Sequence, residues 1–229
     1  EDTFVKLANK YPDSPLASQA WFWASECADW QHKAPESIRF YRMQVFEKYP
    51  TSPFAPEAYF NFYSFAEYLN GDSQALHHLE KMPEKYPYSP SSSIAYYLLG
   101  LNYKKLGESN LNIQQLQRAV ISFENAAKLF ETNNEINFIP KEQFEYHLTV
   151  YFRSLLESGL THLSLANQQT GIKKQLALET TNEVLLSILT HFEDETSPFS
   201  EILKESQPFP KIFEEAHFSL AQLHLTTNN

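Results

Sequence analysis

The chain has 229 residues, and a globular chain of this length buries roughly 70 to 75% of the surface that it exposes when unfolded. Lys and Arg number 18 against 28 Asp and Glu, so the formal net charge of −10 repels phosphate backbones and we expect no nucleic-acid partner. With 18 Phe, 13 Tyr and 3 Trp but only 5 Gly, the chain has too few glycines for a turn-rich β-sandwich or a phosphate-binding loop, and we expect an all-α fold.

Cysteine usage and hydropathy narrow the class of protein further. Cys27 is the single cysteine, so no intramolecular disulfide can form. The longest mostly apolar stretch, residues 94–101, is far shorter than the roughly 20 residues of a membrane-spanning helix. The chain starts with Glu1, Asp2 and Thr3 rather than with the basic residues of a signal peptide. We therefore expect a soluble chain, with any targeting segment outside it.

A segment of the form Tyr-Pro-x-Ser-Pro occurs three times, at residues 11–15, 49–53 and 86–90, and we call these segments the joins. They start 38 and then 37 residues apart, which is typical of a repeat architecture. Because proline disfavours the α conformation in the residue before it, each join tyrosine is predicted to end a helix. Each join serine is predicted to be the N-cap of the next helix, with proline at the first helical position. The tyrosines are Tyr11, Tyr49 and Tyr86, and the serines are Ser14, Ser52 and Ser89.

The first helix after each join carries a shared motif of alanine and aromatic residues. The copies are Ala20-Trp21-Phe22, Ala58-Tyr59-Phe60 and Ala95-Tyr96-Tyr97, with Ala216-His217-Phe218 near the end of the chain. In the third unit, Gly100 is expected to allow a close approach of the neighbouring helix, and Gly107 to form a left-handed C-cap.

A second, antiparallel helix is expected in each unit, at residues 35–48, 73–85 and about 113–132. Residues 4–10 align with the residues just before the second join, so the chain is expected to open on the second helix of a repeat. That helix is either a capping helix or the remainder of a repeat whose first helix has been trimmed.

With these motifs, residues 4 to about 132 resemble the tetratricopeptide repeat (TPR) family, whose period is about 34 residues. The longer period and the joins are most similar to bacterial cell-envelope members, of the outer-membrane β-barrel assembly lipoprotein and Tol–Pal-associated coordinator types. The resemblance implies a right-handed solenoid of antiparallel helix hairpins. Ser25 and Gly100 match a position where the family has a small residue, whereas Tyr63 departs from it.

Residues 133–229 are expected to continue the same solenoid as divergent hairpins. A long helix is predicted at residues 140–169 and its partner at 172–193. Residues 196–199 repeat 51–54 letter for letter and are predicted to be a degenerate join, before a final helix at about 211–225. We expect about ten helices in all, with regular repeats over residues 1–132, and one continuous solenoid rather than two domains.

Candidate catalytic and metal-binding groups are few and poorly placed. Cys27 has the acidic neighbours Glu26 and Asp29, which suppress a reactive thiolate. His77 and His78 diverge by roughly 100° on a helix and cannot chelate one ion together. Glu214-x-x-His217 lacks the second Glu-x-x-His of a di-iron bundle. Two further sets of polar residues are expected to be solvated. One is Glu142, Glu145 and His147, and the other is the acidic run at residues 193–195. We therefore expect no enzyme activity, no cofactor and no metal.

The TPR resemblance implies a partner-binding groove along the first helices of the hairpins. Its charged and aromatic positions are Phe22, Glu26, Asp29, Trp30, Glu57, Phe60, Glu67, Tyr68, Tyr97, Lys104 and Lys105. Phe22, Phe60 and Tyr97 would form an aromatic ladder flanked by carboxylates, accepting a segment with apolar anchors and positive charge. The alternative is that these aromatic residues pack against the next hairpin.

The resemblance implies a non-catalytic scaffold of a bacterial envelope complex, exported to the periplasm and tethered by an upstream lipidated cysteine. One alternative is a cytoplasmic co-chaperone or secretion chaperone that shields apolar client segments. Another is the targeting arm of an enzyme whose catalytic domain lies outside this chain.

Overall fold

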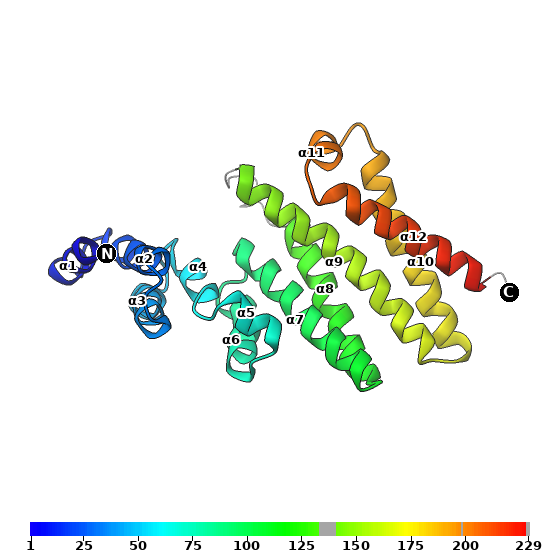
Figure 1. Ribbon diagram of the computed structural model, residues 1–229, viewed down its shortest axis with the longest axis horizontal. Coiled ribbons are helices and arrows are strands. Elements are labelled where there is room, and N and C mark those ends of the chain that lie inside the picture. The colour runs from blue at the N-terminus through cyan, green and yellow to red at the C-terminus, as the bar shows by residue number, and fades with distance from the viewer. Residues whose placement is uncertain (133–140, 198, 228–229) are drawn as a thin grey trace. The chain divides into compact units, whose positions relative to one another are not determined.

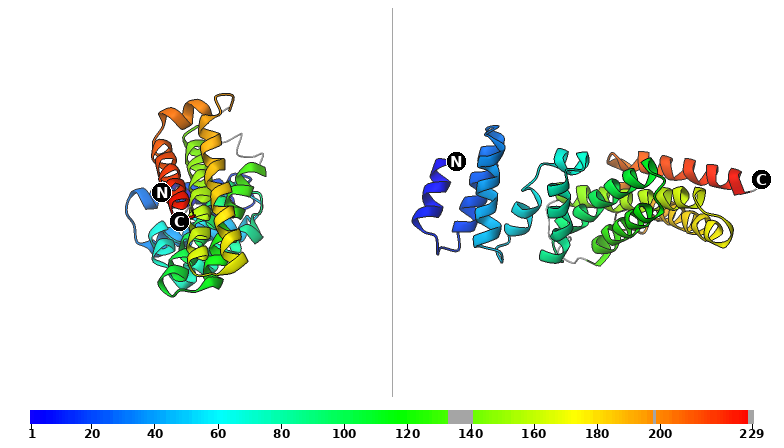
Figure 2. Two further views of the ribbon diagram at one scale, coloured as in Figure 1. Left: turned by 90° about the vertical axis from the view of Figure 1, so that its right-hand side faces the viewer. Right: turned by 90° about the horizontal axis from the view of Figure 1, so that it is seen from below.

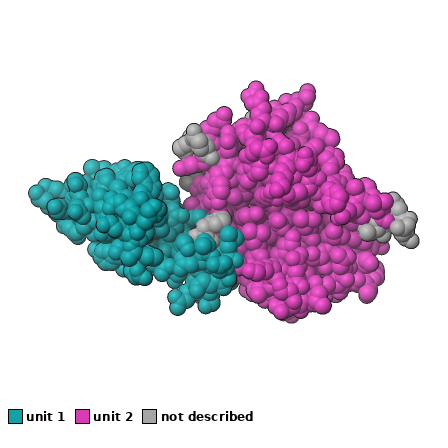
Figure 3. All heavy atoms as spheres, viewed as in Figure 1, with its two compact units in different colours: residues 1–87 teal, residues 88–229 magenta. Residues whose placement is uncertain are grey.

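The computed structural model describes residues 1–132, 141–197 and 199–227, which form twelve helices and no strand (Figure 1). The all-α expectation is confirmed. In the same residues, no helix is both long enough and apolar enough to span a bilayer. The chain divides into two compact units, unit 1 at Glu1–Pro87 and unit 2 at Tyr88–Asn229 (Figure 3). This division falls inside the third join, whereas the sequence pattern changes at residue 132.

Unit 1 consists of six helices that pack mainly on their neighbours along the chain. They are α1 Asp2–Lys10, α2 Ala17–Trp30, α3 Pro35–Lys48, α4 Ala55–Phe60, α5 Phe65–Asn70 and α6 Ser73–Lys85. The helix α2 packs on both α1 and α3, α3 also packs on α4, and α6 packs on both α4 and α5. The expected second helices at 35–48 and 73–85 are confirmed as α3 and α6.

Unit 2 is built around the long helix α9 (Figures 1 and 2). Its helices are α7 Pro90–Ser109, α8 Ile113–Thr132, α9 Lys141–Asn167, α10 Gly171–Glu193, α11 Ser200–Glu205 and α12 Phe209–Thr227. The helix α9 contacts α7, α8, α10 and α12, and a large apolar cluster that includes the fully buried Phe152 and Phe209 lies among α8 to α12. The expected first residue of α9, at 140, lies outside the described residues.

The three join tyrosines share one backbone conformation. Their φ and ψ angles are −130° and 61° at Tyr11, −128° and 56° at Tyr49, and −134° and 65° at Tyr86. Each N–H donates to the carbonyl four residues before it, at 2.9 to 3.0 Å. The tyrosines therefore end helices α1, α3 and α6, as the following prolines predict.

The join serines start a common turn, but only Ser89 is the N-cap of a helix. The carbonyls of Ser14, Ser52 and Ser89 accept from the N–H three residues ahead at 3.0, 3.0 and 2.9 Å. The α7 helix begins directly at Pro90, whereas α2 and α4 begin only at Ala17 and Ala55. The hydroxyl of each serine accepts the N–H two residues ahead. The N-cap prediction is wrong for Ser14 and Ser52 because the chain there makes a further turn, and Leu16 and Phe54 are the N-caps.

The degenerate join at residues 196–199 makes the same turn. The Ser197 carbonyl accepts from the Ser200 N–H at 3.1 Å, and the Ser197 hydroxyl accepts from the Phe199 N–H at 3.2 Å. Asp194 occupies the place of the join tyrosine and ends α10. The sequence match therefore identifies a local structure common to both units, although residue 198 itself lies outside the described residues.

The first helix of a hairpin is continuous where a small residue occupies the position of Ser25 and Gly100, and it is broken where Tyr63 occupies that position. Ser25 is fully buried within α2, and a Cβ atom at Gly100 would lie 2.5 Å from the Phe123 ring of α8. Such a close packing leaves no room for a tyrosine ring. At Tyr63 the helix is broken instead: α4 ends at Phe60, and α5 starts at Phe65 with a capping box formed by Ser64 and Glu67. This break and the short α11 account for the two helices beyond the ten that the sequence predicts.

Gly107 is not the predicted C-cap. It lies inside α7, which continues to Ser109, and a Cβ atom there would lie 2.7 Å from the Leu116 side chain. Gly107 thus acts as Gly100 does, by letting α8 approach α7 closely. A left-handed cap does occur at Gly71, with φ of 75° after α5.

Candidate partner-binding cleft

A cleft of about 380 Å³ lies in unit 1, between the hairpin of α2 and α3 and the break that separates α4 from α5. Three of the predicted groove residues line it, namely Glu26, Asp29 and Glu67. Two arginines of α3, Arg39 and Arg42, line it with them. Arginines three residues apart lie on the same face of a helix, which here is the face turned to the cleft.

Arg42 connects α2 to the end of α4. Only 10% of its side chain is exposed. Its Nη2 lies 2.7 Å from Asp29 Oδ2 and 3.5 Å from Glu26 Oε1, and its Nη1 donates to the Asn61 carbonyl at 2.6 Å. The Asp29 carboxylate compensates the charge of the desolvated Arg42 guanidinium. We therefore expect the ion pair of Arg42 and Asp29 to hold this wall of the cleft in place.

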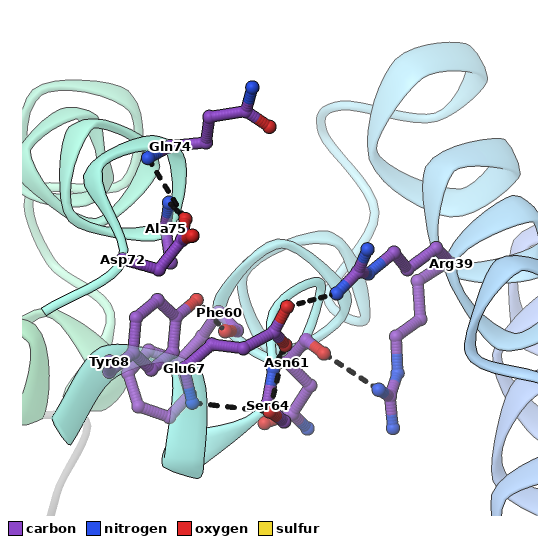
Figure 4. A network of polar contacts seen from close by, with 10 residues as sticks. Arg39, Phe60, Asn61, Ser64, Glu67, Tyr68, Asp72, Gln74 and Ala75 are labelled. Carbon is purple, nitrogen blue, oxygen red and sulfur yellow. Dashed lines mark hydrogen bonds and ion pairs between the residues drawn. The ribbon is translucent and has the colours of Figure 1, made fainter. Parts of the chain in front are cut away.

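Arg39 and Glu67 close the other side of the cleft (Figure 4). The Arg39 guanidinium donates to Glu67 Oε1 and lies over the Tyr63 ring, 4.9 Å from its centroid. Glu67 Oε2 accepts from the Ser64 N–H and hydroxyl, each at 2.7 Å. Burial alone raises the pKa of Glu67, but these hydrogen bonds and Arg39 outweigh it and lower that pKa overall.

Glu57 adds negative charge that the arginines do not fully compensate. Desolvation raises the pKa of Glu57, repulsion from Glu26 raises it further, and Arg42 only partly opposes this. Three carboxylates, Glu26, Asp29 and Glu67, thus line the cleft with two guanidiniums, and Glu57 lies close enough to Glu26 for their charges to repel. The excess of negative charge is the electrostatic property that a cationic group would complement.

The aromatic groove positions of unit 1 do not share one environment. Phe22 is 5% exposed and packs on Phe54, with ring centroids 5.2 Å apart. Tyr68 is 1% exposed, and its hydroxyl donates to the Phe60 carbonyl at 2.6 Å across the helix break (Figure 4). Phe22 and Tyr68 therefore belong to the packed interior rather than to an open ladder, because each fills the space between consecutive helices. Trp30, by contrast, is 79% exposed at the end of α2.

The groove positions of the third hairpin lie in unit 2 and face α9. Lys104 Nζ is 2.7 Å from Glu157 Oε2, so this lysine already has a partner within the fold. Tyr97 packs on Phe123, and desolvation, followed by the charge of Glu157, raises its pKa to about 12. Lys105 remains exposed.

Arg39, Arg42 and Tyr63 are among the cleft residues that the sequence reasoning missed. The TPR resemblance directs attention to the first helices of the hairpins, whereas both arginines are on α3, a second helix. Their three-residue spacing on a helix that returns against Glu26 and Asp29 is the signal that could have indicated ion pairing.

Within the described ranges, no three His, Cys, Asp or Glu side chains gather closely enough to hold a metal ion. Cys27 is half-buried. No protein-family model matches the chain, and no curated protein sequence is significantly similar to it. The likeness to the TPR family therefore rests on the joins and on the motif that follows them.

Proposed function

We propose that this chain is a non-catalytic protein-binding scaffold, a TPR-like solenoid of helical hairpins, and that the unit 1 cleft binds a partner segment carrying positive charge and an apolar anchor. The observation that carries the proposal is that three carboxylates line the cleft with only two guanidiniums, while Glu57, outside the lining, adds repulsion toward Glu26. A lysine or arginine of the partner would relieve that repulsion. Phe62 lines the cleft beside the charges and can supply apolar contact area, and Trp30, which follows Asp29 at the end of α2, is 79% exposed.

The affinity expected from this arrangement is moderate and depends on salt. An exposed ion pair contributes about 0.2 to 1 kcal/mol, and an apolar side chain that becomes fully buried contributes roughly 1.5 to 3 kcal/mol. The carboxylates therefore select the sign of the partner's charge, while the anchor supplies most of the free energy of binding.

Fluorescence anisotropy with defined peptides tests the proposal. One peptide alternates Lys with Leu, and a matched peptide alternates Glu with Leu. We expect the lysine peptide to bind more tightly, with an affinity that falls at high salt and falls further in Glu26→Gln and Glu57→Gln. Glu47→Gln, on the opposite end of α3, is the matched control and should leave binding unchanged. Equal binding of both peptides, or insensitivity to the two cleft variants, would refute the proposal.

A location in a bacterial envelope completes the proposal and rests on the resemblance of the joins alone. Cell fractionation of the complete gene product, with its native upstream sequence, tests it. Recovery in the cytoplasm would instead favour the co-chaperone alternative.

A further inference from the structure

A second, chemically different groove lies in unit 2. It has a volume of about 720 Å³ and is lined by α8, α9 and α10. Helix α9 packs on both α8 and α10, and its C-terminal part contributes the buried Leu165 to the groove. Ile121 of α8 and Leu176 of α10 also line the groove and remain 57% and 61% exposed. Aliphatic side chains that stay this exposed along one groove are characteristic of an interaction surface.

The charge of this groove is opposite to that of the unit 1 cleft. Although the chain has a net charge of −10, no carboxylate is among the residues that line the groove. Lys173 lines it, and in the described part of the chain this lysine makes no ion pair. His162 also lines it, with Nε2 3.8 Å from the Glu124 carboxylate beside the groove. The groove therefore complements a segment that combines aliphatic residues with a negative charge.

The walls favour a helical partner over an extended one. An extended segment needs regularly spaced hydrogen-bond partners for its own backbone, and the backbone groups inside α8, α9 and α10 are already paired within their helices. The groove offers such a segment only separate side chains, such as those of Gln117 and Gln168. An amphipathic helix satisfies its backbone internally and presents aliphatic side chains along one face. A second copy of this chain is disfavoured because two chains of charge −10 repel each other.

We propose that the groove lined by α8, α9 and α10 docks an amphipathic helix of a partner protein, with aliphatic residues facing Ile121 and Leu176 and an acidic residue beside Lys173. The positive end of the α10 dipole, one turn away at Gly171, adds to the attraction for that acidic residue. The chain would then hold two partners, a basic segment in unit 1 and an acidic helix in unit 2.

Three synthetic peptides of about 15 residues, roughly four helical turns, provide the probes. The first has leucines on one helical face and glutamates beside them, the second has lysines in place of the glutamates, and the third is a scrambled version of the first. We expect the full chain to bind the glutamate peptide most tightly, and the bound peptide to gain helicity by circular dichroism. Leu176→Asp and Ile121→Asp should each weaken that binding by about tenfold or more.

Two further variants test separately how the charge of Lys173 and an exposed apolar side chain outside the groove affect peptide binding. Lys173→Glu should reverse the preference, so that the lysine peptide binds more tightly than the glutamate peptide. Ile172→Asn is the matched control, because Ile172 is 85% exposed on α10 but does not line the groove, and asparagine adds no charge beside Lys173. Its binding should equal that of the unchanged chain. Thermal melts establish that the variants, all at exposed positions, remain folded.

Several results would overturn the proposal. Equal binding of the scrambled peptide would exclude a helical face, and a preference for the lysine peptide would exclude the charge argument. Self-association that Leu176→Asp abolishes, seen by sedimentation, would identify a second copy as the occupant. Glu57→Gln should leave binding of the glutamate peptide unchanged, so this result and the test of the unit 1 cleft are independent.

Discussion

At the scale of single residues, the close packing of α7 on α8 depends on Gly100. A methyl group there would lie 2.5 Å from the Phe123 ring, which is fully buried and cannot turn aside. We predict that Gly100→Ala lowers the free energy of unfolding by about 1 to 3 kcal/mol, although alanine favours the helix by about 1 kcal/mol. Denaturant unfolding measures the loss.

Gly159→Ala is the matched control for this change. Gly159 is also inside a helix, but a Cβ atom there would meet only the Leu185 and Val184 side chains, at 3.3 Å or more. The expected change in unfolding free energy is close to zero, within about 1 kcal/mol. Equal losses at the two glycines would contradict the specific role of Gly100.

Glu67 makes the stability of unit 1 depend on acid pH. Because its pKa is lower in the folded chain than in the unfolded chain, Glu67 stabilises the fold above the unfolded pKa of about 4.3. That contribution is lost as the pH falls through the folded pKa. Glu67→Gln keeps a side chain able to form the capping box but removes the charge.

We predict that Glu67→Gln is less stable than the unchanged chain at pH 7 and that the difference vanishes below the folded pKa. Unfolding curves at a series of pH values measure this. The control is Glu47→Gln, which removes an exposed carboxylate of α3 outside the Ser64 and Glu67 capping box. A difference for Glu67→Gln that persists at low pH would show that the charge is not responsible.

At the scale of elements, the first two joins are linked to one another as well as being alike. The Tyr49 hydroxyl of the second join donates to the Pro12 carbonyl of the first at 2.8 Å, and the hydroxyls of Ser52 and Ser18 are 2.9 Å apart. These bonds tie successive hairpins together at their corners. Hydrogen bonding thus fixes the spacing of the repeat at these points.

We predict that Tyr49→Phe lowers the free energy of unfolding by about 0.5 to 1.5 kcal/mol, the usual net contribution of one hydrogen bond. Tyr11→Phe is the control, because Tyr11 is half exposed in the first join, and we expect little change. Thermal unfolding by circular dichroism compares the two. A loss of the same size in both variants would mean that the hydrogen bond from Tyr49 to Pro12 is not responsible, because each change removes only a hydroxyl.

The elements were predictable where local chemistry decides them. Proline after tyrosine, and serine two residues further, are enough to place the ends of α1, α3 and α6 and the turns that follow. The break at residues 61–64 was predictable only as a departure at Tyr63, because it depends on how closely the neighbouring helix packs. The carboxylates of the cleft were named from the sequence, and the spacing of Arg39 and Arg42 was the sequence signal for their pairing.

At the scale of the whole molecule, each of the two compact units has its own buried side chains. The large apolar cluster that contains Phe152, Phe209 and Leu185 lies entirely within unit 2. In unit 1, Tyr68, Leu79 and Met82 are fully buried. We expect the two units to unfold with separate stabilities.

The prediction is that Phe152→Ala destabilises unit 2 by about 3 to 5 kcal/mol, because it leaves a cavity beside fully buried neighbours. Hydrogen exchange read by mass spectrometry should then show faster exchange in peptides of residues 88–229 and unchanged exchange in residues 1–87. Parallel acceleration in both units would contradict separate stabilities.

Chemical-shift mapping of the whole chain tests the central claim most directly, by locating where a basic segment binds. On titration with the lysine and leucine peptide, we predict that amide shifts change at Glu26, Asp29 and residues 61–67, and that these changes disappear in the Glu26→Gln, Glu57→Gln double variant. Changes confined to other surfaces, or changes of the same size with the glutamate and leucine peptide, would contradict the assignment of the unit 1 cleft as the binding site.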